Sequence, residues 1–354
     1  MYRTPLGTPN LEDMGLRWLT HSFASQPIAI HFGSDVVRMM QIHSSKERKL
    51  QSAVEVVSTD SGAIKIALSS FKGTRCVVSI SSSEVLVQHV RVALDSDESA
   101  IRLHLVKCDP RWGDAEIRNV SITTTGGSSN PKQEILCVGI ERQKTCELIE
   151  KIESAGGEVI AVTVPLYASI RAFDQLYRRD GDEKITSLLI DMDENASMVM
   201  IAHGANCVFA HRLDTNTKSQ NATSDKQWQG TPSLTPLSSD SSKTDFERRC
   251  ESQPRGLQCT EASEQSIEEK LEHELERCLR HHDALFPERA VDRIIFTGRG
   301  ASDTDRCSAI ASKLGIAGFI ADPSAWIVGA EDYAAGPAWT TAAGICMRYA
   351  EKAA

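Results

Sequence analysis

The clearest candidate for metal chemistry is one acidic turn that follows a buried apolar run. Asp191, Asp193 and Asn195 alternate as the first ligands of an EF-hand calcium loop do. That loop also needs a glycine at its sixth position and a glutamate at its twelfth, and these are Ala196 and Ala202 here. The sequence therefore predicts no calcium site at this turn.

A second group of potential ligands lies on a predicted helix at residues 266–283. His273, Cys278, His281 and His282 share this helix, but His273 and His281 are about two helical turns apart. This spacing favours a solvated polar face over a metal site. The motifs G-x-S-x-G, H-E-x-x-H, G-x-G-x-x-G and the Walker loop are absent from the sequence, so no constellation for covalent or acid–base catalysis is evident.

Three short turns after buried apolar runs remain as candidate ligand sites. They are residues 31–35 (His-Phe-Gly-Ser-Asp), residues 191–197 and the Gly298-Arg-Gly300 turn with Ala301. The last turn has little side chain, so a ribose or an adenine edge can pass over its backbone. Such glycine turns join strands to helices in many α/β folds, and this one alone is a weak signal.

Length and charge narrow the class of protein. The 354 residues are enough for two domains or one bilobal one. The net charge is 39 − 48 = −9, which argues against a nucleic-acid partner. Apolar runs are far shorter than the roughly 20 residues of a membrane-spanning helix, and residues 1–25 lack the pattern of a secretory signal. The ten cysteines include no C-x-x-C pair, and we expect a reducing cytoplasm.

The elements that position the turns form an internal repeat. A buried run, a polar turn and a returning strand begin at Ile28, and the same succession begins at Ser187. The repeat predicts two lobes of duplicated architecture that face each other. The expected strands of the first lobe are 28–32, 36–42, 53–57, 64–68 and 76–80, and those of the second include 187–191, 197–202, 207–212 and 293–297.

The rest of the chain completes a predicted division. Residues 27–84 and 166–186 form the first lobe, residues 85–165 an inserted α/β subdomain, and residues 187–354 the second lobe. Residues 1–26 form a lead-in whose helix at 11–23 has an apolar stripe that packs on its own domain or meets a membrane surface or a partner. Residues 215–264 contain 16 Ser or Thr and only five large apolar residues, so we expect them to be disordered.

Three stretches resemble the PilM family of type IV pilus assembly proteins, actin-like relatives of the division protein FtsA. They are residues 28–42, residues 135–173 and residues 267–323 with the terminal helix. The order strand, helix, Ala-Gly-Gly, strand, proline, helix at 134–173 is the most similar part. The resemblance covers most of the chain except the first 25 residues and the serine-rich tract. It implies a bilobal actin-like fold of the α/β class, duplicated from a ribonuclease-H-like unit, with a subdomain inserted in the first lobe.

In this family the three turns hold Mg-ATP, and the resemblance carries over one set of cofactor-binding residues: Gly33, Ser34, Asp191, Ser197, Gly298, Gly300 and Ala301. Two positions depart from the family's pattern. His31 replaces an acid, and histidine is a poor ligand for the hard Mg²⁺ ion. Asp193 replaces a glycine, and a carboxylate about 4 Å from a phosphate costs on the order of 4 kcal/mol at an effective dielectric of 20. We therefore expect no cofactor or weak Mg-ATP binding.

The resemblance implies a scaffold or adaptor of an inner-membrane pilus or type II secretion-like platform, cytoplasmic and peripheral to the membrane. The implied partner is a PilN-type membrane protein whose cytoplasmic peptide lies in a groove formed by residues 85–92 and 135–172. Self-association is a further possibility. The alternative is an ATP-binding switch with weak Mg-ATP affinity. A sugar-kinase-like enzyme would need a catalytic acid, for which Asp191 and Asp193 are the candidates.

Overall fold

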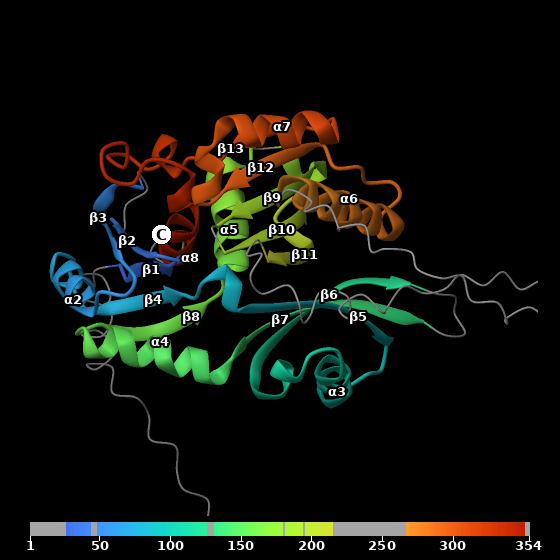
Figure 1. Ribbon diagram of the computed structural model, residues 1–354, viewed down its shortest axis with the longest axis horizontal. Coiled ribbons are helices and arrows are strands. Elements are labelled where there is room, and N and C mark those ends of the chain that lie inside the picture. The colour runs from blue at the N-terminus through green and yellow to red at the C-terminus, as the bar shows by residue number, and fades with distance from the viewer. Residues whose placement is uncertain are drawn as a thin grey trace, which may run out of the picture.

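The structure is a computed structural model and describes residues 26–43, 48–125, 131–179, 181–193, 195–214 and 267–350. The helix predicted at 11–23 and the serine-rich tract predicted at 215–264 lie outside these residues. Two five-stranded sheets and one three-stranded sheet form the framework of the described chain (Figure 1).

The first sheet has the strand order β3-β2-β1-β4-β8. Strands β1, β2 and β3 are antiparallel neighbours, and β4 and β8 run parallel to β1. The central strand is buried along its whole length, as its continuous apolar run predicts. The bounds are β1 Ile28–Phe32, β2 Val36–Ile42, β3 Leu50–Val57, β4 Arg75–Ser79 and β8 Glu158–Thr163.

The second sheet repeats this plan in the order β11-β10-β9-β12-β13. Its first three strands are antiparallel, and β12 and β13 run parallel to β9. Phe32 pairs with Val37 next to the first hairpin turn, and Met192 pairs with Ser197 next to the second. The predicted duplication is confirmed, and the chain has the bilobal actin-like fold. The bounds are β9 Thr186–Met192, β10 Ala196–His203, β11 Asn206–Asp214, β12 Arg293–Thr297 and β13 Ala317–Ile320.

Two helices pack against each other in the middle of the molecule (Figure 1). Helix α5 (Pro165–Ala172) continues as a π-helical turn, and α8 (Thr340–Ala350) crosses it. A Cβ atom on Gly344 would collide with the carbonyl oxygen of Ala168, so the two backbones touch at this point. Helix α8 shares a hydrophobic cluster with Met40 of β2. It therefore packs on the first sheet, although the sequence analysis assigned it to the second lobe.

The inserted unit is a three-stranded sheet in the order β5-β7-β6 with helix α3 on one face. Its elements are β5 (Val85–Ala93), α3 (Glu98–Cys108), β6 (Ala115–Thr125) and β7 (Lys132–Glu141). Leu136 and Val138 of β7 face the opposite way and join the main hydrophobic cluster of the molecule. The insertion therefore has one face against its own helix and one against the lobes.

Strand pairing gives the insertion an earlier end than the predicted boundary at residue 165. After β7 the chain forms α4 (Arg142–Ser154) and then β8, which pairs in parallel with β4 of the first sheet. Parallel pairing depends on a distant partner strand, which local sequence does not reveal. Apart from this boundary and the placement of α8, the division into lobes stays a prediction.

The predicted strand at 64–68 is wrong, because these residues belong to helix α2 (Ser61–Ser69). Asp60 caps the helix by accepting a hydrogen bond from the Ala63 N–H at 2.8 Å. The buried residues Ile64, Ala67 and Leu68 have the i, i+3, i+4 spacing of one helical face. A short apolar run of this length also fits a strand, and only the helical spacing of its buried residues distinguishes the two.

Helices α6 (Ile267–Leu285) and α7 (Thr304–Leu314) pack on the second sheet and share its hydrophobic cluster. Among the described residues, no helix has both the length and the apolar character that a bilayer crossing requires.

Candidate functional site

The structure brings the first two predicted turns together across the two lobes. The hydroxyl of Ser34, in the turn between β1 and β2, donates a hydrogen bond to Oδ2 of Asp193 at 3.1 Å. Asp193 follows β9 in the other lobe. A Cβ atom on Gly33 would lie 3.9 Å from the same carboxylate oxygen. These two turns and the Gly298–Ala301 turn are called the interlobe site below.

The third turn lies against the second through its glycines. Gly298 has a positive φ of 80°, and a Cβ atom there would be only 2.5 Å from Oδ1 of Asp191. A Cβ on Gly300 would be 2.9 Å from the Met192 side chain. Both glycines are therefore required for this turn to close on the end of β9, whether or not a ligand passes over them.

The two remaining predicted site residues are buried in the second lobe. Ser197 is the second residue of β10 and pairs with Met192. Ala301 is fully buried, and its N–H donates to the carbonyl oxygen of Gly298 at 3.2 Å. Both belong to the turns that form the interlobe site, and a ligand-binding role for any of the seven residues stays a prediction.

Asp191 is a buried carboxyl whose surroundings disfavour its ionised form. Thr297 donates a hydrogen bond to its Oδ1 at 3.2 Å. Burial, together with the negative charge of Asp193, raises the pKa of Asp191 to about 7. The Thr297 hydrogen bond and the positive charge of Arg38 act in the opposite direction. The carboxyl therefore exchanges a proton near neutral pH.

Arg38 is a buried cation at the interlobe site that the sequence analysis missed. It lies on β2 and is 4% exposed, and its Nε forms an ion pair with Glu55 at 2.7 Å. Its Nη1 would be 3.6 Å from a Cβ atom on Gly33, which places the guanidinium beside the first turn. The available signal was a charged residue between Val37 and Met39 in an otherwise apolar strand.

His31 stands where the family resemblance places an acid. The residue is buried on β1, directly opposite Arg38 in the strand register. Burial and then the charge of Arg38 lower the pKa of His31 to about 3, so the imidazole is neutral at physiological pH. Its position contributes no negative charge to the site.

Mg-ATP needs hydrogen-bond donors for its phosphates and oxygen ligands for its metal ion. A phosphate would need free backbone donors at the first turn, but the Gly33 N–H donates to the Val36 carbonyl at 2.9 Å. The Asp193 carboxylate already occupies the space beside that turn, and Asp191 faces Thr297 and Gly298. The residues present therefore do not fit Mg-ATP, and we derive no chemical step through it.

The predicted solvated face of the histidine helix is wrong for two of its residues. Cys278 and His282 are buried where α6 packs on the second sheet. Nε2 of His282 lies 2.9 Å from Nε2 of His203, so one imidazole donates and the other accepts. No group of three potential metal ligands occurs among the described residues.

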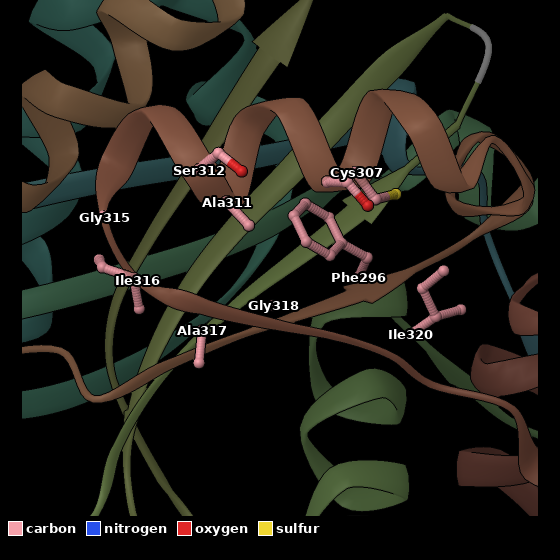
Figure 2. A pocket seen from close by; sticks show the side chains of 10 residues that line it. Phe296, Cys307, Ala311, Ser312, Gly315, Ile316, Ala317, Gly318 and Ile320 are labelled. Atoms are coloured by element: carbon pink, nitrogen blue, oxygen red, sulfur yellow. The ribbon is translucent and has the colours of Figure 1, made fainter.

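A pocket of about 390 Å³ lies between α7 and β13, on the edge of the second sheet (Figure 2). Small and apolar residues line it, including Phe296, Ala311 and Gly318. Burial raises the pKa of Cys307, the thiol in its wall, to about 11, so this sulfur is protonated and unreactive. The pocket contains none of the predicted site residues.

A second candidate site is the surface where the insertion, α5 and the second lobe meet. Among the described residues, ten partly buried apolar side chains pack against the main hydrophobic cluster, and five of them belong to the insertion, α5 and β11. We call them the junction surface: Val87, Val120, Ile122, Tyr167 and Cys207. Val87 and Tyr167 lie in the ranges predicted for a partner groove, whereas Val120, Ile122 and Cys207 were not predicted.

No family model and no curated protein sequence matches this chain. Among solved structures, it is similar to the "PilM-PilN type IV pilus biogenesis complex", with a TM-score of 0.64 and 13% identity over 92% of this chain and 98% of that chain. A Bacteroides thetaiotaomicron protein with an actin-like ATPase fold gives a TM-score of 0.46, with 12% identity over 85% of this chain and 92% of that one.

The cytoplasmic domain of EpsL, an inner-membrane component of the Vibrio cholerae type II secretion system, gives 0.36, with 11% identity over 54% of this chain and 72% of that one. Of these three, the first alone exceeds a TM-score of 0.5. Together with the duplicated sheets, it shows that the chain has the same overall fold, which is bilobal and actin-like.

Proposed function

We propose that the protein is an actin-like scaffold of a type IV pilus or type II secretion-like assembly platform, and that it binds the cytoplasmic peptide of a membrane partner. The observation that carries this proposal is the match along nearly the whole length of both chains to the PilM–PilN complex. Its place would be the cytoplasm, at the inner membrane.

The composition of the interlobe site supports a scaffold without ATP turnover. Ser34 and Asp193 already join the two lobes by a hydrogen bond, and the guanidinium of Arg38 lies beside the same turn. The two lobes therefore contact each other through protein groups at the place where the resemblance expects a nucleotide.

The junction surface is the docking site in this proposal. Its five apolar residues are neither fully buried nor fully exposed, which suits a short peptide that completes their burial. Arg118, exposed on β6 next to Val120, supplies a positive charge at its edge.

The test is a titration with a synthetic peptide, the cytoplasmic N-terminal segment of the PilN-type protein from the same organism. We expect Val120→Glu and Tyr167→Ala each to weaken binding about tenfold or more, because loss of a central apolar contact costs over about 1 kcal/mol. Ile66→Glu is the matched control, since Ile66 is 73% exposed on α2, far from the junction (Figure 1). Equal affinity of all three folded variants would overturn this docking site.

A further inference from the structure

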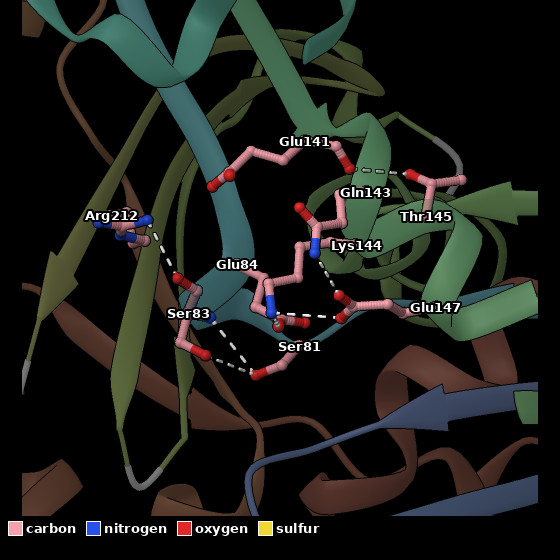
Figure 3. A network of polar contacts seen from close by, with 9 residues as sticks. All are labelled: Ser81, Ser83, Glu84, Glu141, Gln143, Lys144, Thr145, Glu147 and Arg212. Atoms are coloured by element: carbon pink, nitrogen blue, oxygen red, sulfur yellow. Dashed lines mark hydrogen bonds and ion pairs between the residues drawn. The ribbon is translucent and has the colours of Figure 1, made fainter. Parts of the chain in front are cut away.

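The second lobe contacts the inserted unit directly through its outer strand, β11. Arg212 of β11 donates from Nη1 to the carbonyl oxygen of Ser83 at 3.1 Å (Figure 3). The same Nη1 donates to the carbonyl oxygen of Val85 at 2.8 Å. These two carbonyls lie where the chain leaves the first lobe and enters β5. One side chain of the second lobe therefore holds the first residues of the insertion.

A second contact lies further along the same two strands. Nε2 of His89 on β5 is 3.2 Å from the carbonyl oxygen and 3.3 Å from the amide nitrogen of Ala210 on β11. The His89 ring also stacks on Phe209, with ring centroids 4.8 Å apart and planes inclined by 22°. Strands β5 and β11 are thus joined at both the start and the middle of β5.

The other polar contacts at the base of the insertion are weaker. Lys144, at the start of α4, pairs with Glu84 at 3.8 Å and with Glu147 at 3.3 Å (Figure 3). All three side chains are about 40–50% exposed, and solvent screening leaves such pairs little net stabilisation. The partly buried Arg212 contact is therefore the main polar restraint on the base of the insertion.

Strand β11 also belongs to the junction surface and to the sheet of the interlobe site. Cys207 of β11 is one of the five junction residues. Arg212 pairs with Met198, which in turn pairs with Asp191, so the three residues form one row across the second sheet. Any shift of the second lobe relative to the first would move this row and, with it, the contact to Ser83 and Val85.

We infer that β11 of the second lobe, through the Arg212 side chain and through the Ala210 backbone that His89 of β5 contacts, holds the inserted unit in its position and thereby forms part of the docking surface for the partner peptide. The docking part of this inference rests on the proposed function. A partner that binds at the junction surface therefore senses the arrangement of the second lobe as well as that of the insertion.

The experiment combines hydrogen exchange of the full chain with the peptide titration. Arg212→Met keeps most of the apolar stem and removes the donors, and His89→Phe keeps the stacked ring and removes the contact to Ala210. Each variant is expected to speed amide exchange within residues 82–92 about tenfold in the free protein and to weaken binding of the PilN-type peptide by a similar factor. Arg280→Met is the control, because Arg280 lies on α6, is 61% exposed and pairs with Glu276.

The two readouts separate failure of this inference from failure of the proposed function. Unchanged exchange at 82–92 in folded Arg212→Met and His89→Phe proteins would overturn the restraint. Faster exchange with unchanged peptide affinity would overturn the proposed role of β11 in peptide docking. If the wild-type protein binds no peptide, the proposed function fails, while the exchange rates still decide whether β11 restrains the insertion.

Discussion

Asp191 and Arg38 are the residues whose charges define the interlobe site. One is a buried carboxyl with a raised pKa, and the other is a buried guanidinium that partly offsets it. A ligand-binding role for Asp191 stays a prediction, and Arg38 was not among the residues that the family resemblance implies. Their electrostatics instead predict how the stability of the protein depends on pH.

We expect Asp191→Asn to stabilise the protein at pH 8 by about 1–3 kcal/mol. Because the folded-state pKa is raised to about 7, the stability that this carboxyl contributes is fully present below about pH 4 and is lost as the pH rises to 7. The asparagine side chain of the variant keeps an oxygen that accepts the Thr297 hydrogen bond, and it cannot ionise. Wild type should therefore lose stability between pH 4 and 7 relative to the variant.

Urea unfolding of both proteins at pH 5 and pH 8 measures this difference. The exposed Asp95→Asn substitution serves as the control and should leave the pH dependence unchanged. A variant less stable than wild type at pH 8 would mean that ionised Asp191 is stabilised, by Arg38 or another cation, more than burial destabilises it.

At the scale of elements, helices α5 and α8 cross with their backbones in direct contact. Glycine at position 344 lets the two helices touch at Ala168. The atoms that face Gly344 belong to the backbone of α5, which cannot move aside as a side chain can. Substitution here therefore has to separate the helices.

We expect Gly344→Ala to destabilise the protein by about 3 kcal/mol, although alanine is favoured over glycine in an isolated helix by about 1 kcal/mol. Thermal or urea unfolding measures the change. Gly62→Ala in α2 is the matched helical control, because its Cβ would meet only the Asp60 side chain at 3.2 Å. If Gly344→Ala were as stable as wild type, the helices would have to cross less closely than described.

The strands of both lobes were largely predictable, and the contacts between them were not. Continuous apolar runs bounded by polar turns placed β1, β9 and β12 because these strands are buried on both faces. Arg38 and the carboxylates of the second lobe are far apart in sequence, so the sequence alone could not reveal that they lie close together in the fold. The junction residues Val120, Ile122 and Cys207 come from separate strands for the same reason.

At the scale of the whole molecule, two alternatives remain for the interlobe site. A scaffold holds its lobes together through protein contacts such as Ser34–Asp193, whereas an ATP-binding switch must open these contacts for the ligand. Convergence of the three turns is common to both alternatives. The difference between them is measurable in solution.

Calorimetric titration with Mg-ATP up to millimolar concentration is expected to give no binding heat. The Asp193 carboxylate beside the first turn opposes a phosphate there by an energy equivalent to roughly a thousandfold in affinity. Micromolar binding would contradict this expectation and favour the switch. In that case Gly300→Glu, whose side chain would collide with Met192, should abolish the heat if the nucleotide binds at the interlobe site.

The position of α8 on the first sheet also has a consequence for biosynthesis. Met40 and Val77 share their hydrophobic cluster with Ala342 and Ile345, which the ribosome adds some 300 residues after Met40. At about 5–20 residues per second, the amino-terminal half waits on the order of 15–60 s with this apolar face uncovered. During translation the nascent chain should therefore depend on chaperones until α8 has emerged, and ribosome-bound chains that lack α8 should bind them most strongly.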